Sequence, residues 1–351
     1  MLFCAFTNDV FALAPLAWDP GHTPLAPAGS GGAGTWDLTT ANWSNGLSDI
    51  MWNNVAPGTA IFGGTAGTVT VSSGINISTL DFQTDGYMLT GGSLVLGAGG
   101  VITTATGTTQ IASTLGGADL TKSGGGTLTL SGANTYLGGT IVNAGTLLIN
   151  NVSGSGTGSG SVIVNNSGSV LGGSGTMTGP VTVNSGATLA PGATASSTAI
   201  LNTGSVTLLG ATLALNVNGT TAGTSYDQLN VSGAITITGG TLALNFGAFT
   251  PAATDRFFIT LNDGIDPVIG TFASVTGLPS GFALVYDANR DGGLVGNDIA
   301  IQAIPEPSTW CAAAFAAAII SFQLRHRARA ASWKFIHRLA EALAASTRFK
   351  Q

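Results

Sequence analysis

The sequence predicts an all-β protein, a β-solenoid body followed by a single C-terminal transmembrane helix. Short segments in which apolar and polar residues alternate recur along the body, and each is typical of a half-buried strand. Gly-Gly, Asn-Gly and Ser-Gly pairs separate these segments and supply the positive φ angles that tight turns need. Equivalent strands return about every 20 to 25 residues, as in the coils of a solenoid, whereas a β-sandwich built from the same strands would show less regular spacing. The spacings that set this period are Val162 to Val181, Val170 to Leu189, Leu189 to Leu213 and Val181 to Val206.

Several of these segments are expected to form strands of the body. Stacked coils would bury their Val, Leu and Ile side chains in a continuous column and leave Thr, Ser and Asn outside. Asn side chains at the corners are also expected to form ladders from one coil to the next. The segments are residues 68–71, 93–96, 127–130, 146–149, 161–164, 181–183, 205–208, 212–215, 235–237 and 241–244.

The N-terminus has the features of a truncated export signal. Residues 1–14 resemble the end of a signal peptide, with Ala12 and Ala14 as the small residues of the cleavage site. No Lys or Arg precedes them, so we expect the gene to begin upstream of Met1. Residues 15–35 are rich in Pro and Gly and are expected to form a linker.

Aromatic residues gather in residues 36–100, which we expect to form an N-terminal capping region. Trp36, Trp43, Trp52 and Phe62 all lie in its first half. A repeat array must cover its open end, and a cluster of rings would do so. The alternative is that Trp36 or Trp43 is exposed and stacks on sugar rings, as in a glycan-binding adhesin.

One stretch of the body matches a repeat pattern almost completely. Residues 122–147 read KSGGGTLTLSGANTYLGGTIVNAGTL. They resemble the autotransporter-associated β-strand repeat, whose pattern is roughly K-x-G-x-G-x-L-x-L-S-G-x-N-x-Y-x-G-x-T-x-V-x-x-G-x-L. Residues 181–191 and the run Tyr226-Asp227-Gln228-Leu229 also resemble regions in which that repeat occurs. The resemblance implies an exported, right-handed parallel β-helix. We expect its repeats to occupy residues 101–250, with the best one at 122–149, and residues 251–304 to add C-terminal strands.

The C-terminal part combines two prolines around a glutamate, a short apolar run and an arginine cluster. These are Pro305, Glu306 and Pro307, the predicted helix 310–324 from Trp310 to Leu324, and Arg325, Arg327 and Arg329. The prolines interrupt regular structure, the apolar run can enter a bilayer, and the arginines hold its far end in the cytoplasm. Residues 305–329 therefore resemble the PEP-CTERM sorting signal of Gram-negative envelope proteins.

That resemblance implies a route and a set of partners. We expect the protein to be held in the inner membrane by its C-terminal helix, processed by an exosortase-type protease, and delivered to the cell surface or the extracellular space. Exopolysaccharide is a further expected partner. Residues 330–351 read as an amphipathic tail that lies on the cytoplasmic membrane surface.

The body is acidic. Between residues 36 and 304 there are twelve Asp, no Glu and only three basic residues, and the region contains no cysteine. Such a surface repels phosphate backbones, so we expect no nucleic-acid partner. The absence of cysteine leaves the body without disulfides or thiolate chemistry.

Candidate catalytic residues are few, and we expect no enzymatic activity and no cofactor. Asp81 with Asp85, and Asp263 with Asp266, are the closely spaced carboxylates that acid–base chemistry would need. His22 is the only histidine of the predicted exported part. The alternative is a carbohydrate-active β-helix enzyme that uses Asp81 or Asp85.

One loop has the spacing of oxygen ligands in an EF-hand. Asp287, Asn289, Asp291 and Asp298 would be its calcium ligands. An EF-hand needs flanking helices, and the flanking segments here read as strands, so we expect a hairpin loop without metal. The sequence therefore favours an exported structural protein of the cell surface.

Overall fold

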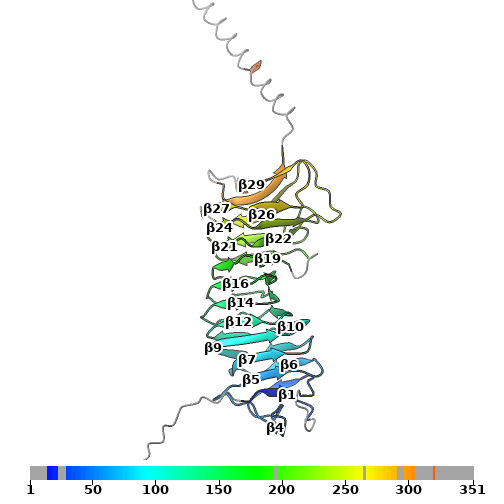
Figure 1. The fold of residues 1–351 in the computed structure, drawn as a ribbon, viewed down its shortest axis with the longest axis vertical. Helices are drawn as coiled ribbons and strands as arrows, with labels where there is room; N and C mark the ends of the chain where they lie inside the picture. Colours follow the sequence, from blue (N-terminus) through cyan, green and yellow to red (C-terminus); the bar gives the residue numbers. More distant parts are fainter. Residues whose placement is uncertain are drawn as a thin grey trace, which may run out of the picture. The chain divides into compact units, whose positions relative to one another are not determined.

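Parallel strands stacked in successive coils form the body of the molecule (Figure 1). The computed structural model describes residues 14–22, 29–192, 197–263, 266–290, 296–304 and 319–320. The chain divides into two units, residues 1–302 and 303–351, and the coils lie in the first. The prediction of an all-β solenoid is confirmed.

Two sheets run along the stack, and each coil adds a strand to both. The first sheet has 14 strands among the described residues, namely β1 (Leu16–Trp18), β3 (Trp43–Ser44), β4 (Asp49–Ile50), β5 (Thr59–Phe62), β7 (Ile75–Phe82), β9 (Ser93–Thr104), β11 (Thr114–Gly117), β12 (Leu120–Ser123), β14 (Thr140–Val142), β16 (Val162–Val164), β18 (Val181–Val183), β21 (Val206–Leu209), β24 (Ile235–Thr238) and β27 (Val268–Thr271). The second has 11, namely β2 (Gly34–Trp36), β6 (Thr68–Val71), β8 (Met88–Gly91), β10 (Thr108–Ile111), β13 (Thr127–Leu130), β15 (Thr146–Ile149), β17 (Val170–Gly173), β19 (Thr188–Pro191), β22 (Thr212–Asn216), β25 (Thr241–Asn245) and β28 (Ser274–Thr276). Every strand segment expected from the sequence lies in one of these strands to within one residue.

A third sheet joins the stack toward its C-terminal end. It has five strands in the order β20, β23, β26, β30 and β29. Its first three strands are parallel, whereas β30 pairs antiparallel with β26. The strands are β20 (Ile200–Thr203), β23 (Gln228–Val231), β26 (Arg256–Asn262), β29 (Phe282–Ala288) and β30 (Asp298–Ala303).

The register of the coils agrees with the predicted period at three of its four spacings. Val162 pairs with Val181, Val181 with Val206, and Leu189 with Leu213. The fourth spacing is wrong by one residue, because Leu189 pairs with Leu171 rather than with Val170. Leu171 is buried, whereas Val170 is only half-buried. A slip of one residue exchanges the two faces of a strand, so packing selects Leu171.

The coils lengthen toward the C-terminus. Along the first sheet the chain advances 19 residues from Val162 to Val181, then 25 to Val206, 29 to Ile235 and 33 to Val268. The additional residues of the longer coils form β20, β23 and β26. A third wall therefore appears only where the coil is long enough to contain it.

Asparagine ladders join the corners of neighbouring coils, as predicted. Asn165 donates a hydrogen bond from Nδ2 to Oδ1 of Asn143 at 3.2 Å and accepts one from Nδ2 of Asn184 at 2.7 Å. Each of these residues follows a strand of the first sheet directly. Inside, the column Val142, Val164 and Val183 is buried, as the alternation of the sequence predicts.

Antiparallel strands lie at both ends of the coils. At one end β3 pairs antiparallel with β1 and with β4, and at the other β30 pairs with β26. Such strands cover edges that would otherwise pair with another chain. The N-terminal end differs from the prediction, because the expected linker 15–35 contains the buried strand β1 and most of β2. The expected capping region 36–100 also contains parallel coils of its own.

The targeting segments lie largely outside the described residues. Ala14 is described and exposed, whereas Ala12 is not described. The predicted sorting segment 305–329 and the predicted tail 330–351 lie outside the described residues, apart from residues 319–320. The described part of the chain includes no helix that is long and apolar enough to span a bilayer.

Candidate functional site

Aromatic rings fill the N-terminal end of the stack. The Trp43 ring packs against Trp18, Trp36 and Trp52 at centroid distances of 5.1, 4.8 and 4.8 Å, and against Phe62 at 5.6 Å. Trp36 and Trp43 are 0% exposed and Trp52 is 3% exposed. The alternative of an exposed tryptophan platform for glycans is therefore wrong, because a buried ring cannot stack on a sugar.

Trp18 is a member of this cluster that the sequence prediction missed. It lies in the expected linker, but β1 carries it into the interior between β3 and β5. Its Nε1 donates a hydrogen bond to the Gly32 carbonyl at 2.9 Å. The local signal was the short apolar run Leu16-Ala17-Trp18, which is long enough for one strand of a solenoid.

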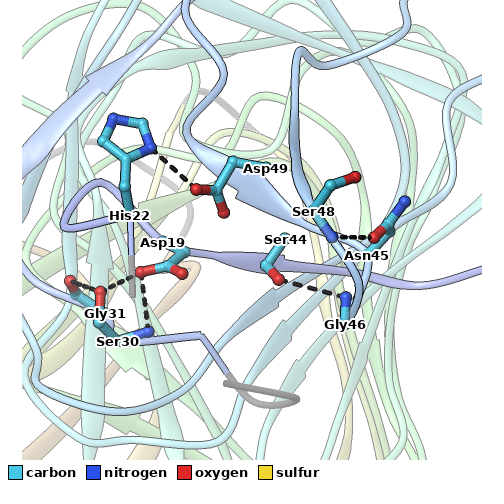
Figure 2. Close-up of polar contacts among 9 residues, drawn as sticks. All are labelled: Asp19, His22, Ser30, Gly31, Ser44, Asn45, Gly46, Ser48 and Asp49. Carbon is cyan, nitrogen blue, oxygen red and sulfur yellow. Dashed lines mark hydrogen bonds and ion pairs between the residues drawn. The ribbon is translucent and has the colours of Figure 1, made fainter. Parts of the chain in front are cut away.

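Two separate polar contacts fasten the loops beside this cluster, and Figure 2 shows both. Buried Asp19 accepts hydrogen bonds from the backbone N–H and the hydroxyl of Ser30. Exposed His22 contacts Asp49 of β4, with 3.2 Å between Nδ1 and Oδ2 (Figure 2). His22 has a φ of 51°, the left-handed region, at the turn that follows β1. These contacts tie the loop after β1 to the β3–β4 hairpin and give His22 a structural role.

The candidate catalytic carboxylates hold turns. Asp81 of β7 accepts a hydrogen bond from Nε2 of Gln83 at 2.9 Å, and Asp85 accepts one from the backbone N–H of Thr108 in the next coil. No hydrogen bond joins Asp81 to Asp85 in the described part of the chain. The second candidate pair, Asp263 and Asp266, flanks residues 264–265, which are not described.

The predicted calcium ligands are divided between a strand and a capped turn. Asp287 lies inside β29 and is exposed, so the loop does not begin where an EF-hand loop would. Asp298 is buried, and its two oxygens accept hydrogen bonds from the backbone N–H groups of Asn262 and Arg290, both at 3.0 Å. Asp291 is not described. Among the described residues no group of three or more His, Cys, Asp or Glu side chains could hold a metal.

A buried lysine lies at a corner of the repeat. Lys122 is 0% exposed and occupies the interior position next to Ile102 and Val142 of the neighbouring coils. Its Nζ donates to the carbonyl oxygens of Ser123, Gly124 and Ala144 at 2.8, 2.8 and 3.1 Å. Burial lowers the pKa of Lys122 to about 8. The lysine of the repeat pattern thus joins two consecutive corners.

A buried aspartate plays the corresponding part in the longer coils. Asp227 is 0% exposed; its Oδ1 accepts a hydrogen bond from the N–H of Ala199 at 2.8 Å, and its Oδ2 accepts two from Asn216 at 2.7 and 3.1 Å. Burial raises the pKa of Asp227 to about 6, although these hydrogen bonds act to lower it. Asp227 therefore fixes the start of the third sheet to the end of β22.

A groove lies across the C-terminal ends of β20, β23 and β26. Its volume is about 430 Å³. We call it the third-sheet groove. The residues that give it its chemistry are Thr176, Asn202, Asn230, Asn262, Asp263 and Arg290. The sequence prediction did not identify this site.

Side chains in the groove form a polar column that crosses the strands. Asn202 pairs with Asn230, and Nδ2 of Asn230 donates to Oδ1 of Asn202 at 3.2 Å. Thr176 of the preceding coil forms a bridge to Asn202. Within the described residues, the side-chain oxygens of Asn230 and Asn262 accept no hydrogen bond. Both oxygens are buried, and Asn230 pairs with Leu261 in the next coil, so the polar column ends at Asn230.

Charges of both signs lie at one end of the third-sheet groove. Arg290 and Asp263 are exposed, and neither forms a salt bridge within the described residues. The groove can consequently donate from a guanidinium and accept at a carboxylate, besides the amides and hydroxyls of the column.

Comparisons with known proteins connect the solenoid with autotransporter passengers. The passenger-associated-transport-repeat family matches residues 120–149, which contain β12, β13, β14 and β15. A relative, the adhesin BmaC autotransporter of Brucella suis biovar 1 (strain 1330), is 45% identical over 175 residues. That alignment covers 46% of this chain and 5% of the relative, so the chain spans a small part of that protein's length. The resemblance of residues 122–147 to an autotransporter-associated repeat is confirmed.

Proposed function

We propose that this chain is an exported, non-enzymatic β-solenoid that acts at the cell surface as an adhesive or structural scaffold. The observation that carries the proposal is the 45% identity to an autotransporter adhesin. The passenger repeat at residues 120–149, which forms an integral part of the stack, gives further support. A long solenoid presents an extended lateral surface, which suits contact with a large partner.

The arrangement of carboxylates supports a role without catalysis. Asp85, Asp227 and Asp298 each accept hydrogen bonds from backbone N–H groups, so they serve as structural acceptors. General acid–base catalysis needs two such groups that face one substrate. A carbohydrate-active enzyme at Asp81 or Asp85 would predict turnover of acidic polysaccharide that is lost in Asp81→Asn or Asp85→Asn.

Delivery to the surface is the second part of the proposal. We infer that the apolar segment 310–324 holds the chain in the inner membrane until an exosortase-type protease acts near Pro305-Glu306-Pro307. The support is the order of the proline motif, the apolar run and the arginines at 325, 327 and 329. Cell-surface material, including exopolysaccharide, is the expected surrounding of the mature protein, and nucleic acid is not an expected partner.

Mass spectrometry of the mature C-terminus tests this route. The protein would be purified separately from the envelope and from the culture fluid of the native host. We expect the residues beyond the Pro-Glu-Pro region to be missing in the surface and released forms. A uniformly intact C-terminus would contradict processing. Failure of an added protease to digest the body on intact cells would contradict surface exposure itself.

A further inference from the structure

We propose that Asn45 is a site of spontaneous deamidation, in which the backbone nitrogen of Gly46 attacks the Asn45 side chain. Both residues lie in the turn between β3 and β4, and Asn45 is exposed. The modification needs no enzyme and no cofactor, so the inference is independent of the proposed surface function. It depends on the conformation of Gly46, on the contacts of the Asn45 oxygen and on the access of water to the turn.

Gly46 shapes the turn and leaves its nitrogen accessible. Its φ is 83°, and a Cβ atom at this position would meet no other atom within 4 Å. Ser44 pairs with Asp49, so residues 45–48 close a tight hairpin in which glycine occupies the first central position. Because glycine has no side chain, the Gly46 nitrogen can approach the side chain of Asn45 without a steric clash.

Backbone donors hold the side-chain oxygen of Asn45. Its Oδ1 accepts hydrogen bonds from the N–H of Leu47 at 2.9 Å and from the N–H of Ser48 at 2.8 Å, the second of which is drawn in Figure 2. Attack at Cγ places negative charge on this oxygen, and donors already directed at it stabilise that charge, as in an oxyanion hole. The Gly46 N–H donates to Oγ of Ser44 at 3.2 Å, the long end of the normal range, so the nitrogen is weakly held (Figure 2).

The reaction requires only water. The Gly46 nitrogen loses its proton to solvent and forms a bond to Cγ of Asn45, which closes a succinimide ring. The bond from Cγ to Nδ2 breaks, and Nδ2 takes up a proton and leaves as ammonia. Water then opens the ring at either carbonyl, which gives aspartate or isoaspartate. No group is oxidised or reduced.

Asn53 provides a comparison in the same chain. It is also exposed, and its Oδ1 accepts hydrogen bonds from the N–H groups of Val55 and Ala56 at 2.9 and 3.4 Å. The residue after it is Asn54, whose Oδ1 and backbone carbonyl accept hydrogen bonds from Asn76 of the next coil at 2.8 and 2.9 Å. These contacts restrict the Asn54 nitrogen, so Asn53 should react slowly although its oxygen has similar donors.

Asn218 is the matched control, because it too is exposed and is followed by a glycine. Its N–H donates to the Ser225 carbonyl at 2.6 Å, and a Cβ atom on Gly219 would lie 2.8 Å from the Cβ of Ser225. Gly219 is therefore packed against Ser225, whereas Gly46 has open space around it. The Gly219 nitrogen is less free to move towards the side chain that it would attack.

The modification would change the hairpin. A carboxylate formed at position 45 adds negative charge to a loop in which Asp49 already contacts His22. In the isoaspartate product the backbone passes through the former side chain and is longer by one methylene, so the turn loses its tight geometry. Because β3 carries Trp43, a looser hairpin would reach the edge of the aromatic cluster.

Peptide mapping by mass spectrometry of the purified full chain tests the proposal. The folded protein would be kept in mildly alkaline buffer, and the fraction of each asparagine converted to aspartate and isoaspartate would be followed over time. We expect Asn45 to react about tenfold faster than Asn53 and Asn218, because it combines an unhindered glycine with two donors to its oxygen. Methylation by a protein isoaspartyl methyltransferase would identify the isoaspartate product.

The same chain unfolded in urea is the control for the effect of the fold. There Asn45 and Asn218 should react at similar rates, because each is followed by glycine and neither turn persists. Conversion of Asn45 in the folded chain that is undetectable, or no faster than that of Asn218, would overturn the inference. Equal rates at Asn45 and Asn53 in the folded chain would also overturn it, since the glycine would then have no effect.

Discussion

The short coils of the repeat and the long coils that follow them solve the same packing problem in different ways. From β12 to β19, two sheets enclose an aliphatic column, and a buried lysine binds the carbonyls of two corners. From β20 onward a third sheet is added, and a buried aspartate binds backbone N–H groups instead. A corner that lacks donors is stabilised by an ammonium, and one that lacks acceptors by a carboxylate.

The difference extends to the asparagines. In the short coils the corner amides of Asn143, Asn165 and Asn184 bond to one another. In the long coils the side-chain oxygens of Asn230 and Asn262 are buried and accept no hydrogen bond among the described residues. Lengthening the coil thus adds a third wall, with the third-sheet groove at its edge.

The largest expected effect is that of Asp227→Ala, which breaks the link on which the long coils depend. It leaves the N–H groups of Ala199 and Asn216 without an acceptor in a buried site. We expect it to lower the free energy of unfolding by about 3 kcal/mol. Hydrogen exchange measured by mass spectrometry should show lost protection in β20 and β23 and unchanged protection in β13 and β15, because repeat arrays open locally.

Asp255→Ala controls for the loss of a carboxylate as such. Asp255 also accepts a backbone hydrogen bond, from Ala252 at 2.8 Å, but in an exposed turn. Loss of this hydrogen bond should lower the free energy of unfolding by less than about 1 kcal/mol. Equal loss of protection throughout the stack in Asp227→Ala would show that the two regions do not unfold separately.

Lys122→Met is expected to have the next largest effect, in the short coils. Methionine fills a similar volume but leaves the carbonyls of Ser123, Gly124 and Ala144 without their donor. We expect a loss of about 2 kcal/mol in denaturant unfolding. Ile102→Met, at the paired interior position of the neighbouring coil, should cost less than about 1.5 kcal/mol. A Lys122→Met variant no less stable than Ile102→Met would mean that the ammonium contributes nothing to the corner.

The sequence predicts the short coils better than the long ones because their determinants are local. Alternating residues and regularly spaced apolar positions indicated the strands, the period and the asparagine ladder. The single error of register arose where two apolar residues, Val170 and Leu171, are adjacent, and only packing distinguishes them. Trp18 was missed because the surrounding Pro and Gly residues indicated a linker.

The third-sheet groove could not be predicted because it depends on contacts between distant residues. Asn202 and Asn230 are adjacent only because the coil between them is 28 residues long, and Asn230 and Leu261 because the next is 31. Neither length follows from a local pattern. The position of the β3–β4 hairpin beside β1 has the same cause, since no local pattern specifies the pairing of β3 with β1.

A pH series would compare the two buried charges directly. The pKa of Asp227 is about 6 in the fold against an ordinary value of 3.8, so the folded state binds more protons between these pH values. Stability should therefore fall as pH rises from about 4 to 6. Lys122 has a pKa of about 8 against 10.5, so the unfolded state binds more protons there and stability should rise from about pH 8 to 10.5. Each slope is at most about 1.4 kcal/mol per pH unit.

Two variants show which residue causes each slope of stability against pH. When stability is measured by urea unfolding, Asp227→Ala should abolish the slope on the acid side and keep the one on the alkaline side. Lys122→Met should abolish the alkaline slope and keep the acid one. If both slopes persist in both variants, other groups are responsible for the pH dependence.

The smallest expected effect concerns the ladders, and it tests whether hydrogen bonds along the stack are additive. Asn165 makes two ladder bonds, one to Asn143 and one from Asn184, whereas Asn184 makes one, to Asn165. Asn165→Ala should therefore lower the free energy of unfolding by about 1.5 kcal/mol and Asn184→Ala by about half as much. If the m value is unchanged, the shifts in the denaturant midpoint of the two variants give the ratio of their losses in stability. Equal effects would mean that the second bond adds nothing once the coil is held by the first, and that the corner ladder stabilises neighbouring coils only in pairs.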